Sequence, residues 1–339
     1  MALRLKPLNQ QTIVVTGASS GIGLATAQMA AQRGARVLLV ARDEAGLEQA
    51  TRDIVAQGGE AMYVVADVGR REDLQLVADT AIEQFGGFDT WVNNAGVSIW
   101  GKLEDVRDRD HQRLFETNFW GVVYGSTIAA AHLRGKGGAI INLGSMASDR
   151  ALPLQGMYSA SKHAVKGFTD SLRMELEEEG TPISVTLIKP AGIGTPFTAH
   201  AKNYTDREPK LPPPVYRPED VAEAILHAAE HPRRDLFVGS ASKMMSSISN
   251  HTPRLLDWIG RRVLVKAQLR EEQVRQQQQG TLYEPGGGGR VHGDHPGQTV
   301  RPSLYTRAVL HPKSTGAVAL AAVAALAWLA AGQGRLRRV

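Results

Sequence analysis

Between residues 12 and 239, short apolar runs alternate with stretches in which apolar side chains recur every three or four positions. The short runs predict buried strands, and the stretches predict helices that pack by one face. Strands separated by helices pair in parallel, because each helix returns the chain to the same edge of the sheet. The sequence therefore predicts a doubly wound α/β fold, with a seven-stranded parallel sheet and helices on both faces.

The expected elements follow this alternation along the chain. The strands are expected near Thr12–Thr16, Val37–Val40, Ala61–Ala66, Thr90–Asn93, Ala139–Leu143, Ile183–Ile188 and Leu236–Gly239. The clearest helices are expected at Asp73–Phe85, Arg109–Leu133, Met157–Glu178 and Glu219–Glu230. The last of these follows Pro218, a residue that suits the first turn of a helix.

The composition changes after about Val265, and this change predicts three parts. Residues 1–265 hold the expected sheet and form a nucleotide-binding domain. Residues 266–313 are rich in Gln, Gly and Pro, which predicts a polar linker with weak order. Residues 314–339 hold an apolar, alanine-rich segment with a basic end.

The charge is divided in the same way. Lys and Arg against Asp and Glu number 27 to 30 over residues 1–260, and 12 to 4 over residues 261–339. The basic excess lies in a tail without interleaved aromatic residues or a nucleic-acid-binding motif, so no nucleic acid is expected as a partner.

The alanine-rich segment raises the question of membrane attachment. Ala317–Ala331 has 15 residues, nine of them Ala, and Lys313 and the terminal arginines flank it. As a helix over residues 316–332 it would be about 25 Å long, against a hydrocarbon thickness of roughly 30 Å. Two interpretations stay open: a short membrane anchor, or a helix that packs on a partner subunit or frays.

The chain has no cysteine, which excludes disulfides, thiolate metal sites and cysteine nucleophiles. No apolar run of a signal peptide precedes Ile13, so a cytoplasmic catalytic domain is expected. His292 and His295 lie near each other but lack further obvious ligands, so no metal site is expected.

A glycine-rich turn, Thr-Gly-Ala-Ser-Ser-Gly-Ile-Gly at residues 16–23, follows the first expected strand. Its glycines permit a tight turn and a close backbone approach, and the next helix offers free N–H groups to a pyrophosphate. The spacing differs from the G-x-G-x-x-G fingerprint, so the position between strand and helix carries the prediction. The expected dinucleotide contacts are Gly17, Ser19, Ser20, Gly21, Ile22 and Gly23.

The residues after the second strand bear on which dinucleotide binds. A carboxylate there would bind the ribose 2′-hydroxyl of NAD, whereas Arg accommodates the 2′-phosphate of NADP. Arg42 occupies this place, and Asp43 is better explained as the N-cap of the next helix. NADP is therefore expected over NAD, although Arg42 can also be an ordinary surface charge. Asp67, with Val68 after the third strand, can accept from the adenine amino group or cap a turn.

Tyr158 and Lys162 stand at i and i+4 on one face of an expected helix. A free tyrosine has a pKa of roughly 10, so about one in a thousand is ionised at neutral pH. A fixed cation nearby favours the phenolate, and lowering this pKa by two units would raise that fraction about a hundredfold. The pair therefore predicts Tyr158 as a general acid and base toward a carbonyl or alcohol oxygen.

Other polar positions lie at strand ends, where parallel sheets bind ligands. Ser145 follows the fifth strand and can hold a substrate oxygen and stabilise developing charge. Asn94, Ala95 and Gly96 end the fourth strand, and Gly96 permits a close approach to the cofactor. Asn118 lies inside an expected helix, where an amide is a poor structural choice.

Together these residues resemble the classical short-chain dehydrogenase/reductase family. The family's motifs recur in order over roughly residues 8–240: Thr-Gly-x-x-x-Gly-x-Gly, Asn-Asn-Ala-Gly, Asn118, Ser145 and Tyr-x-x-x-Lys. The resemblance implies a Rossmann-type fold and hydride transfer between a nicotinamide and a carbonyl or secondary alcohol.

The resemblance also implies a role for each motif residue. Tyr158 would be the general acid and base, and Ser145 would orient the substrate. Lys162 would bind the nicotinamide ribose and lower the pKa of Tyr158. Asn118 would hold a water that connects Lys162 to solvent; the alternative is that it satisfies a buried backbone group.

One segment departs from the family pattern. Pro-Gly usually follows the sixth strand, but residues 189–195 read Lys-Pro-Ala-Gly-Ile-Gly-Thr, with the glycine displaced by one. The resemblance implies that Thr195 and the backbone of Ile193 contact the nicotinamide carboxamide, with Pro190 beside the cofactor. Family members pair through the helices matching 109–133 and 157–178, which implies a homodimer or homotetramer.

Residues 196–216 mix aromatic side chains with three prolines and suit a mobile lid over the substrate. They hold no charged cluster that favours a phosphate or carboxylate, so a carbonyl or alcohol with apolar bulk is expected. An alternative from another class is a cofactor-binding scaffold or membrane-recruited interaction protein without turnover. The complete Ser-Tyr-Lys set favours the enzyme, because a scaffold needs no tuned phenol.

Overall fold

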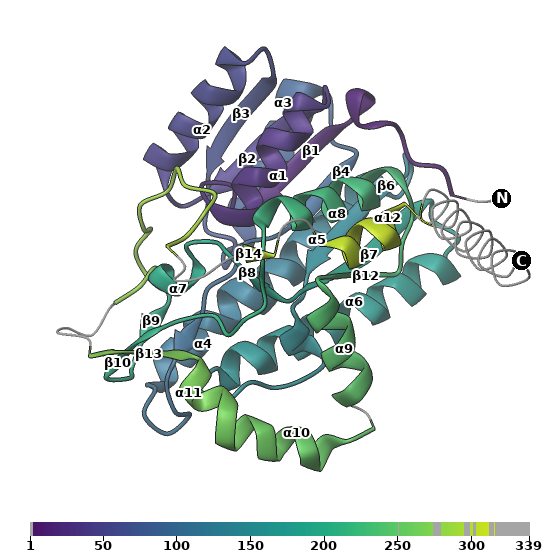
Figure 1. Cartoon of the computed structure of the whole chain (residues 1–339). Helices are drawn as coiled ribbons and strands as arrows, with labels where there is room; N and C mark the ends of the chain where they lie inside the picture. The colour runs from purple at the N-terminus through teal and green to yellow at the C-terminus, as the bar shows by residue number, and fades with distance from the viewer. Residues whose placement is uncertain are drawn as a thin grey trace, which may run out of the picture.

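Seven parallel strands form one sheet at the centre of the computed structural model (Figure 1). Their order is β12-β7-β6-β4-β1-β2-β3, and all neighbours pair in parallel. The doubly wound, Rossmann-type fold is thus confirmed. The strands are β1 Thr12–Thr16, β2 Arg36–Ala41, β3 Glu60–Val65, β4 Thr90–Asn93, β6 Gly138–Leu143, β7 Ile183–Pro190 and β12 Asp235–Val238. The structure describes residues 3–249, 251–273, 279–294, 299–300, 303–311 and 315.

Helices cover both faces because successive strand residues point to opposite sides of the sheet. Ile13 and Val15 belong to the core cluster of one face, whereas Val14 and Leu38 belong to that of the other. The first face carries α1 Gly21–Gln32, α2 Glu44–Ala56 and α8 Pro218–Glu230, and the second carries α3 Arg71–Phe85, α5 Gly121–Leu133 and α6 Gly156–Glu178. On each face, apolar side chains of the strands and of the helices therefore pack into one core cluster.

The helix expected over 109–133 is divided into three. It consists of α4 Asp108–Phe115, a π-helical turn at Glu116–Trp120 (η2), and α5. A π turn inserts an extra residue per turn and is frequent at functional sites. Here it contains Asn118, which is fully buried.

The remaining helices and strands are short. They are η1 Leu8–Gln10, β5 Ile99–Trp100, η3 Met146–Ser148, β8 Gly192–Ile193, α7 Phe197–His200, β9 Lys202–Asn203, β10 Arg207–Pro209, β11 Val215–Tyr216, α9 Ser240–Ser249, α10 Pro253–Ile259, η4 Gly260–Leu264, α11 Val265–Ala267, β13 Leu269–Gln273, β14 Thr299–Val300 and α12 Leu304–Leu310.

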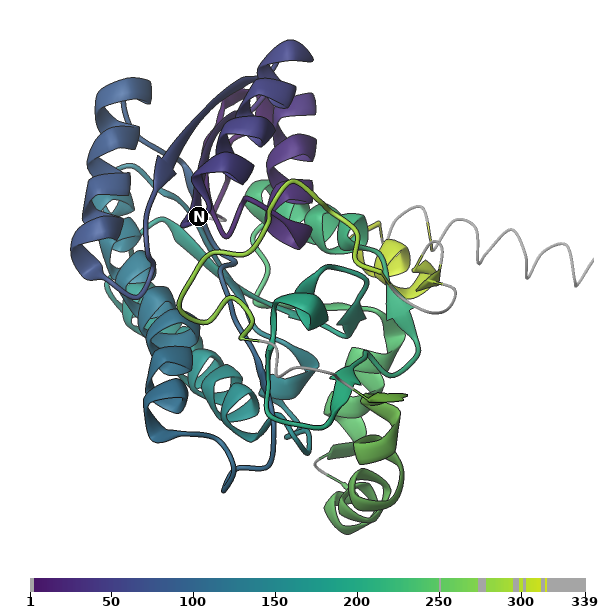
Figure 2. The same ribbon diagram turned by 90° about the vertical axis from the view of Figure 1, so that its left-hand side faces the viewer.

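The C-terminal extension folds back onto the sheet domain, which differs from the expected polar linker over 266–313. β13 pairs with β10, β14 pairs with β11, and α12 packs against α8 and β12. Residues 279–294 run past the N-terminal end of α1 (Figure 2). The composition predicted a linker because glycine is common in flexible chains. Several of these glycines instead lie where a close backbone contact leaves no room for a side chain.

The proposed anchor segment 316–332 lies outside the described residues. Within the part of the chain that the structure describes, no helix combines the length and apolar character needed to cross a membrane.

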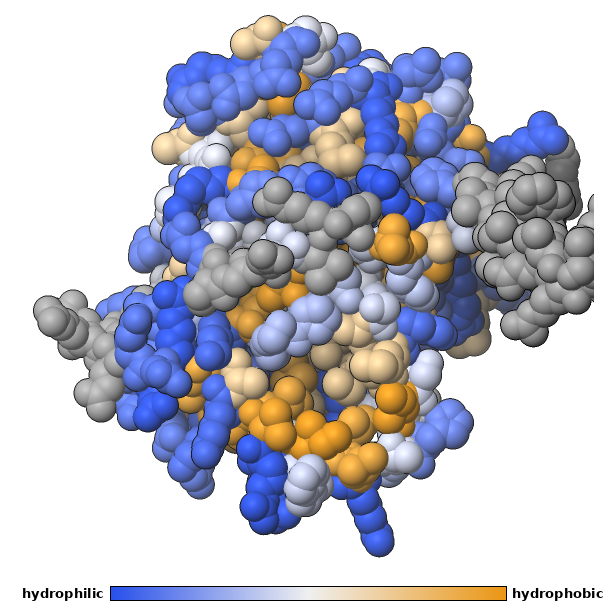
Figure 3. Space-filling view, viewed as in Figure 1, coloured by the Kyte–Doolittle hydropathy of each residue, from blue (hydrophilic) through white to orange (hydrophobic). Residues whose placement is uncertain are grey.

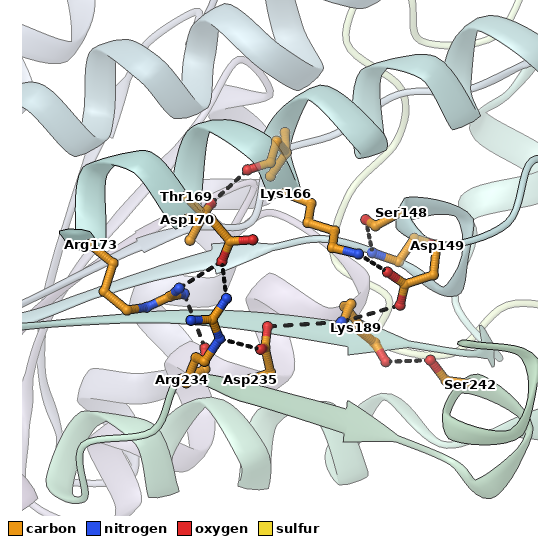
Figure 4. A network of polar contacts seen from close by, with 12 residues as sticks. Ser148, Asp149, Lys166, Thr169, Asp170, Arg173, Lys189, Arg234, Asp235 and Ser242 are labelled. Carbon is orange, nitrogen blue, oxygen red and sulfur yellow. Dashed lines mark hydrogen bonds and ion pairs between the residues drawn. The ribbon is translucent and has the colours of Figure 1, made fainter. Parts of the chain in front are cut away.

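A buried ion-pair network fastens the chain after β6 to the end of β7 (Figure 4). Lys189 at the end of β7 lies 3.1 Å from Asp149 and 3.8 Å from Asp235, and Lys166 of α6 also pairs with Asp149. The hydroxyl of Ser242 donates to the carbonyl of Lys189 over 2.8 Å. The loops that follow these two strands therefore start from a common rigid support.

We predict that Leu38→Ala lowers the free energy of unfolding by about 2–5 kcal/mol, since Leu38 is fully buried in β2 and its removal leaves a cavity. Denaturant unfolding of the purified protein measures this change. Leu76→Ala is the matched control, because Leu76 is 56% exposed on α3, and it should change stability by no more than about 0.5 kcal/mol. Equal effects of both substitutions would contradict the packing described here.

Candidate active site

A cavity of about 430 Å³ opens at the carboxyl ends of β1, β4, β6 and β7. Parallel sheets bind ligands at this end, where the strand order reverses between β1 and β4. The structure describes every site residue expected from the sequence, and all of them except Gly23 and Asn118 line this one cavity. The fold therefore brings together groups that lie as far as 178 positions apart, from Gly17 to Thr195.

Glycine is required in the turn after β1 because its backbone touches the chain after β4. Gly17 and Gly21 have φ values of +67° and +56°. A Cβ at Gly17 would lie 2.8 Å from the Cα of Ala95, and one at Gly23 would lie 2.1 Å from the carbonyl oxygen of Gly17. Gly23 thus serves the shape of the turn rather than the cavity wall, and the turn fits the close backbone approach that a pyrophosphate needs.

Thr16, which the sequence analysis did not select, holds this contact together. Its hydroxyl oxygen accepts from the backbone N–H groups of Asn94 and Ala95 at 3.0 and 3.1 Å. The side-chain amide of Asn94 donates to the carbonyl of Thr16 at 2.8 Å. A threonine ending a strand is too common to be recognised as a site residue from sequence alone.

Arg42 follows β2 at the far end of the cavity, and its guanidinium is engaged by the C-terminal extension. It donates to the carbonyls of Tyr283 at 2.8 Å, Leu282 at 3.3 Å and Thr281. Burial lowers the pKa of Arg42, and nearby Asp67 acts in the opposite direction. Arg42, the residue predicted to bind the 2′-phosphate, therefore also holds the C-terminal extension in place.

Asp67 forms an ion pair with Arg113 of α4 and lies 3.9 Å from Arg42. Its other oxygen accepts from the N–H of Gly69 at 2.9 Å, which is the turn-capping alternative considered for it. Its adenine-binding role stays a prediction. Arg113 was missed because only the tertiary fold carries α4 to the end of β3.

The N-cap prediction for Asp43 is confirmed. One carboxylate oxygen accepts from the N–H of Gly46 at 3.3 Å at the start of α2. The other is buried and has no hydrogen-bond partner among the described residues.

Ser145, Tyr158 and Lys162 face the cavity together. Burial raises the pKa of Tyr158 to about 12, although a hydrogen bond with Ser145 opposes the rise. Burial likewise lowers the pKa of Lys162 to about 8. Its ammonium group donates to the carbonyl of Leu143 at 2.8 Å and lies 5.8 Å from the centre of the Tyr158 ring.

In this structure the pKa of Tyr158 is raised and not lowered, with burial as the main cause. The lowering of this pKa by Lys162 stays a prediction. Both groups lose water, and desolvation disfavours the charged form of each. The spacing alone predicted proximity correctly, but it carried no information about burial.

The side chain of Asn118 forms hydrogen bonds with the backbone of Val97. Its amide oxygen accepts from the Val97 N–H at 2.8 Å, and its amide nitrogen donates to the Val97 carbonyl at 2.9 Å and to the Ser161 hydroxyl at 3.2 Å. The structure thus shows the alternative role of Asn118, in which it satisfies a buried backbone group. The water-holding role stays a prediction.

The other end of the cavity is largely apolar, with one buried polar pair. Its lining includes Leu152, Phe197, Met244, Met245 and Leu264. Gln155 donates to Gln268 of the extension over 2.6 Å, and both amides are almost fully buried. Apolar side chains also gather on the nearby surface over α10 and its neighbours (Figure 3).

Comparison with known proteins agrees with this geometry. The family described as short chain dehydrogenase matches residues 11–206. The chain belongs to this family. A relative with similarity along most of the chain is the uncharacterized oxidoreductase YxnA of Bacillus subtilis (strain 168), which is 46% identical over 332 residues, 97% of this chain and 92% of the relative.

Two solved structures show the same fold with a nicotinamide nucleotide or its derivative. A short-chain dehydrogenase/reductase of Burkholderia phymatum in complex with NAD has a TM-score of 0.67 and 26% identity, covering 74% of this chain and 97% of its own. An alcohol dehydrogenase of Thermococcus sibiricus complexed with 5-hydroxy-NADP has a TM-score of 0.59 and 25% identity, covering 67% and 95%. This short-chain dehydrogenase is thus an oxidoreductase whose family binds NAD or NADP.

The segment with the displaced glycine after β7 forms a short strand in this short-chain dehydrogenase. Gly192 and Ile193 form β8, which pairs with β11. Thr195 then lies against the glycine turn, since a Cβ built on Gly21 would be 3.2 Å from the Thr195 side chain. Pro190, Ile193 and Thr195 all line the cavity, and their contacts with the nicotinamide stay predictions.

We predict that Tyr158 stays protonated in the cofactor-free protein up to about pH 10.5, because burial raises its pKa to about 12. Tyrosinate absorbance of the wild type and of Tyr158→Phe should rise in parallel over this range. An additional tyrosinate that titrates between about pH 7 and 9 only in the wild type would contradict the prediction. Circular dichroism at each pH verifies that both proteins remain folded.

Proposed function

We propose that this protein is an NADP(H)-dependent oxidoreductase that interconverts a carbonyl and a secondary alcohol, with Tyr158 as general acid and base. The observation that carries the proposal is one cavity shared by the glycine turn and by Ser145, Tyr158 and Lys162. A scaffold without turnover would need only the glycine turn.

When bound, the nicotinamide supplies or accepts the hydride. In the reductive direction, Tyr158 gives its proton to the substrate oxygen; with a pKa of about 12 it is protonated at neutral pH. Ser145 donates a hydrogen bond to the same oxygen and stabilises the charge that develops there. Lys162, with a pKa of about 8, keeps most of its charge at neutral pH and favours the transient phenolate.

The substrate proposal rests on the lining of the cavity. Leu152, Phe197 and Met244 favour an apolar body, while Gln155 and Gln268 offer one place for a polar group. The Phe197 ring lies 5.6 Å from that of Tyr158, so it restricts the space next to the reacting oxygen.

Tyr158→Phe should reduce turnover at least about a hundredfold, because the proton donor is lost while the ring is retained. The dissociation constant for NADPH should change by less than about twofold, since the hydroxyl is aimed at the substrate oxygen. A screen of carbonyls and alcohols that follows nicotinamide absorbance measures turnover, and Tyr63→Phe on β3 is the control. Unchanged turnover would reject the assignment, and cofactor binding without any turnover in the wild type would favour the scaffold.

The preference for NADP is supported by Arg42, a cation that lines the far end of the cavity. Arg113 lies behind it and shares the partner Asp67. One carboxylate oxygen of Asp43 already caps α2 and is engaged there. Its other oxygen, unpaired among the residues described, is the observation that favours NAD, because a ribose hydroxyl could donate to it.

Arg42→Ala separates the two cofactors. Arg42 also holds the C-terminal extension, so some loss of affinity should be common to NADPH and NADH. NADPH should lose about tenfold or more beyond this common part, since a charge-assisted contact to the 2′-phosphate disappears. Fluorescence titration with both nucleotides measures the ratio. An unchanged ratio, or a loss confined to NADH in Asp43→Asn, would contradict the NADP preference.

We also propose a homodimer or homotetramer that pairs through the helices of residues 109–133 and 157–178. Trp120, the last residue of η2, is 44% exposed and stacks on Tyr124, and Met174 on α6 is 60% exposed. A cytoplasmic catalytic domain and a domain boundary near residue 265 stay part of the proposal, supported by the absence of cysteine and the change in composition.

A further inference from the structure

Residues 279–294 of the C-terminal extension, here called the strap, run past the N-terminal end of α1 (Figure 2). They contact the glycine turn and Arg42, which form one half of the cavity. Thr281, Pro285 and Gly286 of the strap line the same cavity as Gly17 and Tyr158. The strap is therefore a wall of the cavity and not a separate surface feature.

The first half of the strap is fastened at the Arg42 end. Besides the three carbonyls that accept from Arg42, the Leu282 carbonyl accepts from Arg113 at 3.2 Å. Four donor contacts from two guanidinium groups hold three successive peptide carbonyls, so the backbone of the strap is held whatever its side chains are. Carbonyls carry no net charge, so Arg42 keeps its positive charge for a phosphate.

Two side chains of the strap reinforce this half. Leu282 is 1% exposed and packs in an apolar cluster with Val97 and Leu114, against which Tyr158 also packs. The hydroxyl of Tyr283 donates to the buried carboxylate of Asp110 at 2.6 Å.

The second half of the strap is fastened at the glycine turn. The N–H of Gly289 donates to the Ser19 carbonyl at 2.8 Å, and the N–H of Gly21 donates to the Arg290 carbonyl at 3.0 Å. The N–H of Gly293 donates to the Gly194 carbonyl at 3.0 Å, in the loop after β7. Gly288 and Gly293 have no room for a side chain: a Cβ at Gly288 would lie 2.3 Å from Asp43, and one at Gly293 would lie 2.2 Å from the Thr195 carbonyl.

We propose that the strap is part of the cofactor site, where it encloses the adenosine and pyrophosphate half of the dinucleotide and must detach before the nucleotide can leave. The inference rests on the proposed function, because it requires a dinucleotide in this cavity. Its basis is that the attachments lie at both ends of the adenosine half, Arg42 at one and Ser19 and Gly21 at the other. Dissociation of the cofactor is then governed by opening of the strap.

Two adjacent glycines give a matched test. In Gly288→Ala the new methyl group meets Asp43 and the Ser19 carbonyl, at 2.3 and 2.8 Å, and displaces the strap from the glycine turn. In Gly287→Ala the methyl group meets no described atom within 4 Å. Stopped-flow displacement of NADPH, followed by its fluorescence, should show dissociation at least about tenfold faster in Gly288→Ala and within about twofold of wild type in Gly287→Ala.

Tyr283→Phe is a second variant that keeps the ring and removes only the hydrogen bonds of the hydroxyl, to Asp110 at 2.6 Å and to the Arg109 carbonyl at 3.3 Å. It should also speed NADPH dissociation, so the test does not depend on the folding of Gly288→Ala. Tryptic cleavage after Arg290, whose side chain is 59% exposed, gives an independent measurement. Saturating NADPH should slow this cleavage in the wild type and less so in Gly288→Ala.

The outcomes separate the two proposals. Normal NADPH affinity and turnover in the wild type, with dissociation unchanged in both Gly288→Ala and Tyr283→Phe, overturns the strap and leaves the proposed function in place. Cleavage after Arg290 that is indifferent to NADPH overturns it as well. Failure of the wild type to bind either NADPH or NADH overturns both proposals together.

Discussion

The contact between the glycine turn and the chain after β4 is the constraint from which the rest of the site follows. Gly17 approaches Ala95 so closely that no side chain fits between them, and the Thr16 hydroxyl holds the two backbones at this separation. Because β1 and β4 are also neighbours in the sheet, the contact places the first turn of α1 over the point where strand order reverses. The loops after β6 and β7, tied together by Lys189 and Asp149, then close the cavity from the other side.

Burial decides how the polar groups in this cavity behave. Desolvation raises the pKa of Tyr158 and lowers that of Lys162, so both favour their uncharged forms more than they would in water. The same burial requires Asn118 to satisfy the backbone of Val97. Within the proposed mechanism, the tyrosine is therefore a proton donor at neutral pH, and its partner cation is held by a backbone carbonyl and not by the phenol.

Several residues of the sheet domain have a second structural role, because they bind the C-terminal extension. Arg42 and Arg113 hold its backbone, Asp110 accepts from Tyr283, and Gln268 reaches the substrate end of the cavity. Within the proposed function, a strap attached at both ends of the adenosine half couples nucleotide exchange to a segment outside the sheet. A glycine-rich composition served this close contact, although the same composition is typical of linkers.

The sheet, the helices on both faces, the glycine turn and many of the cavity residues between Gly17 and Thr195 could be predicted from the amino-acid order. These features depend on local periodicity and on motif order, and both can be read along the chain. The roles of Thr16 and Arg113, the π turn at Asn118, the pKa direction of Tyr158 and the path of residues 279–294 could not be predicted in this way and depend on the folded arrangement. Each of these results from contacts between distant segments or from loss of solvent, and neither leaves a periodic signal in the sequence.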